Sequence, residues 1–162
     1  MMRFLLLSTL MMATFLPAGA GTQGPPDSSL RLYPLKDLTV VKVGLGKVTI
    51  PCWLLDTRAK QAEGMMYLTA SEVPVDKGML FAFPDAQPRS FYNRNVTFDL
   101  DLAYIDAQGV AFKSIVLKAK SEKSVPSEKP AKFVLEMRAG AFKKLGIKSG
   151  SKFSIPKDAV GK

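Results

Sequence analysis

A short polar stretch in the middle of the chain carries side chains that could form a binding or catalytic site. It contains Arg94, Asn95, Asp99 and Asp101. If residues 98–105 form a strand, its side chains alternate between faces, so Asp99 and Asp101 point the same way, about 7 Å apart. Two carboxylates at this spacing could hold a hard cation, bind sugar hydroxyls or divide the roles of acid and base. Arg94 could add a fork of donors for an anion.

A further carboxyl and a series of aromatic residues could belong to the same site. Glu136 joins the acidic group if its strand lies beside the strand of Asp101; it could instead form an ion pair. Asp99 and Asp101 could also lie on a solvated face beside arginines, where such pairs contribute about 0–1 kcal/mol. The aromatic residues could line a ligand pocket or simply pack in the core. They are Phe81, Phe83, Phe91, Phe98 and Tyr104.

The residue types that the chain lacks exclude several kinds of chemistry. It contains no histidine and one cysteine, which excludes Ser-His-Asp and Cys-His catalysis and structural zinc sites. No GxxxxGK[ST] phosphate loop and no GxGxxG fingerprint occurs. Cys52 lies in an apolar run between Ile50 and Trp53, which is typical of a buried, unreactive thiol. We therefore expect no cofactor and no bound metal.

Length, composition and charge indicate one globular domain with a basic surface. The chain has 162 residues, of which 47% are hydrophobic, and a formal net charge of +9. Many basic residues are spread from Lys113 to Lys157 with acidic residues among them, rather than forming a block. We therefore expect no specific nucleic-acid partner. The remaining candidate partners are a small molecule or an envelope polymer.

The N-terminus has the features of a secretory signal peptide. Arg3 precedes an apolar run at 4–16, Pro17 ends the run, and Ala18-Gly19-Ala20 offers the small residues that signal peptidase accepts. The run is shorter than the roughly 20 residues that a membrane-spanning helix needs. We expect cleavage near Ala20, export to the periplasm or full secretion, and no membrane span in the mature chain.

The elements that must position the candidate residues are mostly short strands. We predict a signal peptide at 1–20, a flexible leader at 21–36, a single β-rich domain at 37–156 and a polar tail at 157–162. The expected elements are helices at 58–66 and 139–145, an exposed loop at 120–130, and strands at 38–43, 47–55, 79–83, 90–97, 98–105, 110–117, 133–137 and 152–155. About eight short strands with two short helices predict a mainly β fold, either a compact β-sandwich or a partly closed barrel.

A series of motifs in a fixed order gives the chain a recognisable signature. The motifs are GMM at 64–66, KGMLFAF at 77–83, FYNRN at 91–95, DLDLAYID at 99–106, VLE at 134–136 and GIKSG at 146–150. In this order and spacing they resemble the prokaryotic family known as domain of unknown function 192, over roughly residues 45–155. The resemblance implies a compact β-sandwich-like domain that is often exported, and it implies no established activity.

The resemblance also shows which polar positions match the family pattern. Its Phe-Trp-Met-Lys-Asn-Thr segment corresponds to FYNRNV at 91–96, which keeps an aromatic pair that includes Tyr92, a cation at Arg94, and Asn95. The second aspartate of its Pro-Leu-Asp segment corresponds to Asp101. Leu68 stands where the family pattern has an arginine.

Two functions remain open from the sequence, beside a third, an adhesive or scaffold protein that uses its net charge against an anionic polymer. The first is a non-catalytic exported module that binds a small molecule, a saccharide or an envelope component. Its candidate site comprises Tyr92, Arg94, Asn95, Asp99, Asp101 and Glu136. The alternative is a carboxylate-based hydrolase of envelope polymers, with Asp101 and either Asp99 or Glu136 as acid and base; it requires these carboxyls to converge in a cleft.

Overall fold

Runs of β-branched and aromatic residues pair into one extended sheet within residues 26–162, the part of the chain that the computed structural model describes. The signal peptide predicted at 1–20 lies outside the described residues. The elements are η1 (Ser28–Leu30), η2 (Leu35–Asp37), β1 (Val40–Leu45), β2 (Val48–Leu55), α1 (Arg58–Glu63), β3 (Gly78–Phe91), β4 (Leu100–Ile105), β5 (Ala111–Leu117), β6 (Val125–Arg138), α2 (Ala141–Leu145) and β7 (Phe153–Ser154).

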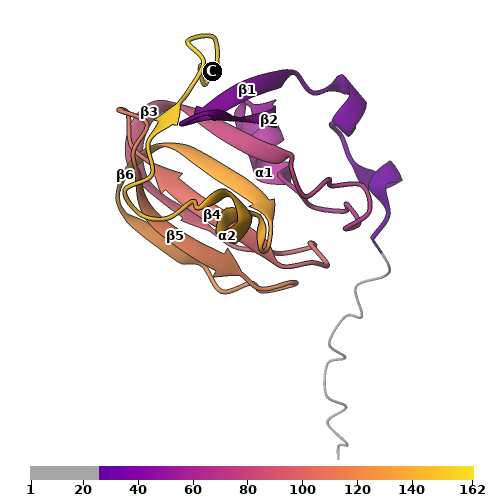
Figure 1. Ribbon diagram of the computed structural model, residues 1–162. Coiled ribbons are helices and arrows are strands. Elements are labelled where there is room, and N and C mark those ends of the chain that lie inside the picture. The colour runs from indigo at the N-terminus through magenta and orange to yellow at the C-terminus, as the bar shows by residue number, and fades with distance from the viewer. Residues whose placement is uncertain (1–25) are drawn as a thin grey trace, which may run out of the picture.

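The sheet curls into a partly closed barrel. Its seven strands lie in the order β5-β4-β6-β3-β2-β1-β7 (Figure 1). Neighbouring strands are antiparallel except β2 and β3, which run parallel and are joined by the crossover that contains α1. β7 pairs with β1, and a bridge between Val110 and Lys152 brings the chain before β7 next to the start of β5. The predicted mainly β fold with minor helices is confirmed.

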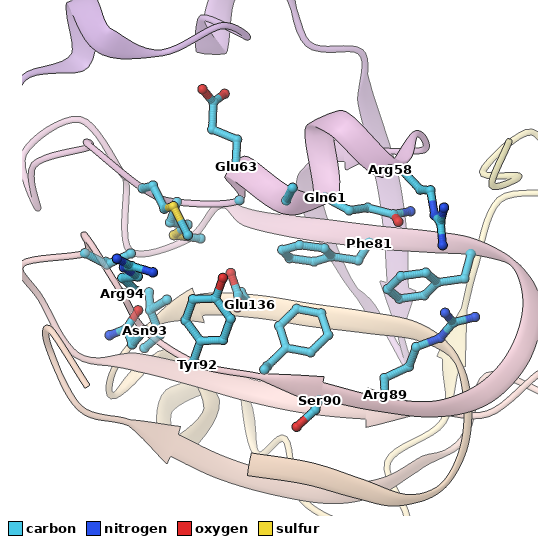
Figure 2. Close-up of a pocket in the computed structure, with 18 residues that line it drawn as sticks. Arg58, Gln61, Glu63, Phe81, Arg89, Ser90, Tyr92, Asn93, Arg94 and Glu136 are labelled. Carbon is cyan, nitrogen blue, oxygen red and sulfur yellow. The ribbon is translucent and has the colours of Figure 1, made fainter. Parts of the chain in front are cut away.

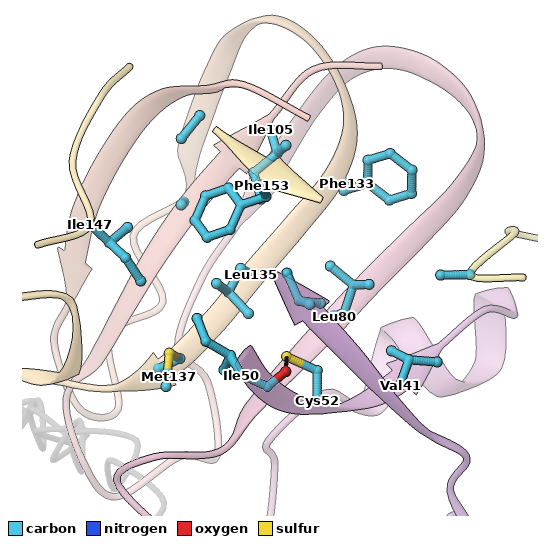
Figure 3. Packing of buried hydrophobic residues seen from close by; sticks show 14 of the residues in the cluster. Val41, Ile50, Cys52, Leu80, Ile105, Phe133, Leu135, Met137, Ile147 and Phe153 are labelled. Carbon is cyan, nitrogen blue, oxygen red and sulfur yellow. Dashed lines mark hydrogen bonds between the residues drawn. The ribbon is translucent and has the colours of Figure 1, made fainter. Parts of the chain in front are cut away.

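Side-chain alternation gives the curled sheet two apolar faces. Each face carries a cluster of buried apolar side chains, which we call the inner cluster and the outer cluster. On β3, Leu80 and Ala82 belong to the inner cluster, whereas Met79, Phe81 and Phe83 belong to the outer cluster. The inner cluster, drawn in Figure 3, includes side chains of α2. The outer cluster includes side chains from the turns that follow α1. The outer face therefore lies against the crossover between β2 and β3.

The single cysteine packs in the inner cluster (Figure 3). Cys52 is fully buried, and its thiol donates a weak hydrogen bond to the Ile50 carbonyl at 3.6 Å. Burial raises the pKa of the Cys52 thiol to about 12. The thiol is therefore protonated at neutral pH, which agrees with the unreactive role expected from the sequence.

The two longest strands differ from the prediction. β3 continues past Pro84 to Phe91, and β6 begins at Val125, inside the segment expected to be an exposed loop at 120–130. The two extensions pair with each other. Register shifts in this part of β3 accommodate prolines, which cannot donate to a strand ladder. The predictions of a strand that ends at residue 83 and of an exposed loop over the whole of 120–130 were therefore wrong.

The strand predicted at 90–97 is also wrong, because a loop replaces it after Phe91. The buried side chain of Asn93 holds this loop in place. Its amide Nδ2 donates to three backbone carbonyls at 3.0, 3.4 and 3.1 Å, those of Phe98, Leu117 and Lys118. These bonds satisfy carbonyls that strand pairing would otherwise have used.

Both ends of the described chain contact the sheet domain. Arg31, in the segment predicted as a leader, is 6% exposed. In the predicted tail, the Lys162 backbone N–H donates to the Asp56 carbonyl at 2.6 Å, and Lys162 Nζ lies 3.1 Å from Asp56 Oδ2. Within residues 26–162, no helix combines the length and the apolar character needed to cross a membrane.

Candidate functional site

A pocket of about 470 Å³ lies on the outer face of the sheet, between α1 and the strands β3 and β6 (Figure 2). Because β2 and β3 are parallel neighbours, the chain must cross between them, and this crossover carries α1 over the sheet. The apolar lining side chains are Ala62, Met65, Met66, Phe81, Phe83, Phe91, Val96 and Leu100. This volume and an apolar wall with a few polar groups are typical of a site for a small organic molecule.

Glu136 brings a buried carboxyl to this pocket. It lies in β6, opposite Met79 of β3 and Leu102 of β4, and both of these neighbours are fully buried. Glu136 itself is 4% exposed, and its carboxyl has no hydrogen bond and no ion pair with any residue in 26–162. Because burial disfavours the charged form, the pKa of Glu136 is raised to about 8. At neutral pH it is mainly protonated and can both donate and accept a hydrogen bond.

A second polar group borders the pocket without a partner. Asn93 uses its Nδ2 for the loop, whereas its Oδ1 is buried and accepts no hydrogen bond from the described residues. Buried polar groups in proteins are usually paired. Asn93 therefore leaves one buried acceptor unpaired beside the cavity that the Glu136 carboxyl lines.

Two arginines lie near each other at one end of the pocket (Figure 2). Arg58 begins α1, is exposed, and makes no ion pair with a described residue. The guanidinium of Arg89 lies 4.0 Å above the ring of Phe83 and forms an ion pair with Asp85. Its Nε is buried and has no partner in the described chain. Stacking on the ring holds this group in a fixed orientation.

The rim of the pocket contains two residues with unusual backbone conformations. Tyr67 and Asn95 have positive φ angles of 67° and 56°, which are uncommon for residues other than glycine. Two hydrogen bonds join these residues. The Tyr67 N–H donates to the Asn95 carbonyl at 3.0 Å, and Asn95 Nδ2 donates to the Tyr67 hydroxyl at 3.4 Å. This contact joins the turn after α1 to the loop after β3, and both segments line the pocket.

A buried ion pair supports the wall formed by the end of α1. Glu63 lines the pocket with its backbone side, but its carboxylate points away from the cavity (Figure 2). That carboxylate lies 3.2 Å from Arg31 and accepts from the N–H groups of Leu32 and Tyr33 at 2.7 and 3.1 Å. Burial lowers the pKa of Arg31, although Glu63 opposes this effect. The Glu63 charge is therefore neutralised outside the pocket.

The structure brings three of the predicted site residues together. Tyr92, Arg94 and Glu136 all line the pocket, with Tyr92 exposed at its mouth. Nε of Arg94 lies 3.5 Å from Oε1 of Glu122, and both side chains are more than half exposed. Asn95 belongs to the adjoining rim rather than to the lining.

Asp99 and Asp101 do not line this pocket. Asp99 accepts from Lys118 Nζ and from the Ala119 N–H, both at 2.8 Å, and the Lys118 hydrogen bond lowers its pKa. Asp101 is buried, and its Oδ2 accepts from the Phe142 N–H at 2.9 Å, where α2 begins. One carboxylate therefore fixes a loop and the other stabilises the start of a helix.

The carboxyls of Asp101 and Glu136 lie on neighbouring strands but on opposite faces of the sheet. In the register of β4 and β6, Asp101 is opposite Met137 and Leu102 is opposite Glu136. Met137 belongs to the inner cluster and Leu102 to the outer one. The converging carboxyls that the hydrolase alternative requires are not formed by these residues. Within residues 26–162, no group of three or more acidic or cysteine side chains could hold a metal ion.

Sequence reasoning missed several residues of the pocket. Of the aromatic series, Phe81, Phe83 and Phe91 line it, whereas Phe98 and Tyr104 do not. The positions of Arg58 and Arg89 in the sequence do not show that they line one pocket, because the crossover between β2 and β3 brings them together. A signal did exist for Asn93, which lies in the same FYNRN motif as Arg94 but was not selected.

Comparison with known proteins places this architecture in a family. Two crystal structures are similar: a protein of unknown function from Novosphingobium aromaticivorans DSM 12444 and a suggested transcription regulator from Sinorhizobium meliloti 1021. The first has a TM-score of 0.69 and 26% identity, covering 83% of this chain and 99% of its own. The second has a TM-score of 0.67 and 25% identity, covering 72% of this chain and 94% of its own. A search of curated proteins gave no match. The family model DUF192, described as an uncharacterised ACR, matches residues 40–155, and the chain belongs to this family.

Proposed function

We propose that this protein is an exported, non-catalytic binding module that holds a small molecule, a saccharide or an envelope component in the pocket between α1 and β3. The observation that carries the proposal is the carboxyl of Glu136, which faces an aromatic-walled cavity and has no hydrogen-bond partner in the described chain. A ligand in the cavity could both donate a hydrogen bond to this carboxyl and accept one from it.

The other features of the pocket support the same function. Its aromatic walls offer flat surfaces for a ring or an apolar body, and a few polar groups converge on the same space. The strained contact between Tyr67 and Asn95 at the rim is the kind of feature that clusters at ligand sites. Export is supported by the sequence of residues 1–20.

A binding role is favoured over the hydrolase because of how the carboxyls are distributed. Glycoside hydrolysis uses two carboxyl groups that flank the scissile bond, about 5–9.5 Å apart. Among the described residues that line the pocket, Glu63 turns its carboxylate away and Glu136 alone directs one toward the cavity. A single carboxyl suits the polar anchor of a binding site.

Thermal melting against a ligand panel tests the proposal. The panel contains monosaccharides, oligosaccharides, nucleotides, organic acids and anionic polymers. A ligand at about 100 times its Kd adds about 2.7 kcal/mol, which raises the melting temperature by several degrees. Glu136→Leu, which removes both the donor and the acceptor, should reduce the rise. The matched control is Glu128→Leu, which makes the same change at an exposed position of the same strand. A flat panel, or a rise that Glu136→Leu leaves unchanged, would contradict the proposal.

A further inference from the structure

The charged groups around the pocket are mostly of one sign. Its lining includes three arginines, Arg58, Arg89 and Arg94. The lining carboxyls do not balance them, because the Glu63 carboxylate points away and pairs with Arg31. Arg89 and Arg94 pair with Asp85 and Glu122, so Arg58 is the lining arginine that no carboxylate in 26–162 neutralises, and its charge favours an anionic ligand.

Two of the arginines are placed to act together. Figure 2 shows Arg58 and Arg89 at the same end of the pocket, with Phe81 and Glu136 farther along it. Arg58 has no ion-pair partner in 26–162, and the buried Nε of Arg89 has no hydrogen-bond acceptor there. Asp85 occupies one side of the Arg89 guanidinium, and the remaining Arg89 donors together with those of Arg58 match the oxygens of a carboxylate or phosphate group.

The rest of the pocket defines what the anionic group must be attached to. Phe81 and Phe91 stack edge to face, with ring centroids 4.9 Å apart, and form an apolar wall. Asn93 and Glu136 line the pocket farther from the two arginines, and neither Asn93 Oδ1 nor the Glu136 carboxyl forms a hydrogen bond with a described residue. An inorganic anion would leave both the aromatic wall and these groups without a contact. A neutral sugar could accept hydrogen bonds from the arginines but would bring no counter-charge to them.

We propose that the ligand is a small organic anion whose carboxylate or phosphate lies between Arg58 and Arg89 and whose ring or apolar body lies along Phe81 toward Glu136. This inference rests on the proposed function and narrows it to one ligand class. It assigns Arg58 and Arg89 as the residues that select an acid over its neutral counterpart. Because Glu136 is mainly protonated at neutral pH, it accepts the ligand without charge repulsion.

Matched pairs of probes that differ only in the anionic group test this inference by calorimetric titration. We would compare glucuronate with glucose, glucose 6-phosphate with glucose, and 4-hydroxybenzoate with 4-hydroxybenzamide, at pH 6.5 and low salt. At least one acid should bind about tenfold or more tightly than its neutral partner. Added salt should weaken that acid more than the neutral compound.

Single substitutions then show which residues make the pocket bind an acid more tightly than its neutral partner. Arg58→Ala and Arg89→Ala should each bring the Kd of the acid toward that of its neutral partner. The control Lys144→Ala removes one positive charge from an exposed position of α2, outside the pocket, and should leave the ratio unchanged. Circular dichroism confirms that each variant is folded. Equal binding of acids and neutral partners would overturn this inference but not the proposed function, whereas no binding by any probe or panel compound would overturn both.

Discussion

Titration of Glu136 should make the stability of this protein fall as pH rises through neutrality. The folded-state pKa of about 8 exceeds the ordinary value of 4.5, so between these values the folded state binds a proton that the unfolded state has lost. The stabilisation is complete below pH 4.5 and disappears as pH rises through 8. One unit of pKa corresponds to about 1.4 kcal/mol, so the whole effect is about 5 kcal/mol.

The composition of the chain makes this effect easy to isolate. There is no histidine to titrate between pH 5 and 8. The other shifted carboxyls, such as Asp56 and Asp99, have lowered pKa values. Cys52 and Tyr104 have raised ones because they are buried. All of these groups therefore titrate outside the window in which Glu136 changes charge.

Urea unfolding at pH 5.5, 6.5 and 7.5 measures the effect. The free energy of unfolding should fall by about 2.5 kcal/mol over these two units, because the slope is about 1.4 kcal/mol per unit until pH approaches 8. Glu136→Gln should flatten the profile, and Glu128→Gln should leave it as in the original chain. A flat profile in the unmutated protein, or an unchanged slope in Glu136→Gln, would refute the reasoning about burial.

Three further predictions concern buried groups outside the pocket. Asp101→Ala should lower the free energy of unfolding by about 1–3 kcal/mol, because it leaves the buried Phe142 N–H unpaired, and should not change ligand affinity; urea unfolding and titration check both. Arg31→Ala should destabilise the protein by about 3–5 kcal/mol, since it leaves Glu63 without its counter-charge; thermal melting measures this, and a loss below 1 kcal/mol would count against the buried pair. Cys52 should react with a thiol reagent only after denaturation, and rapid labelling of the native protein would argue against its burial.

Local patterns in the sequence predicted much of the fold. The β-branched runs at 38–43 and 47–55 correspond to β1 and β2, and the apolar run from Met79 forms the first part of β3. The short helix at 58–66 was shorter than expected but begins where Thr57 accepts a hydrogen bond from the Lys60 N–H. These features depend on neighbours in the sequence, which is why they could be predicted.

The features that were missed depend on pairing between distant segments. The prolines of β3 and β6 are tolerated because the two strands shift register against each other, and no local pattern reveals this. The candidate site also depends on pairing between distant segments, which local patterns do not reveal. Alternation placed Asp101 and Glu136 each on one face of its strand, but only the register of β4 against β6 decides that these faces are opposite. The position of Arg58 follows from the parallel pairing of β2 and β3.

Amide NMR of the labelled protein tests the central claim most directly, because it reports where a ligand binds. The compound that gives the largest thermal shift would be titrated while backbone resonances are followed. Our account predicts that the changes cluster at 58–66, at 89–96 and around Glu136, the segments that line the pocket. Changes confined to Asp99, Asp101 and α2, on the other side of the sheet, would contradict it, as would the absence of any localised change.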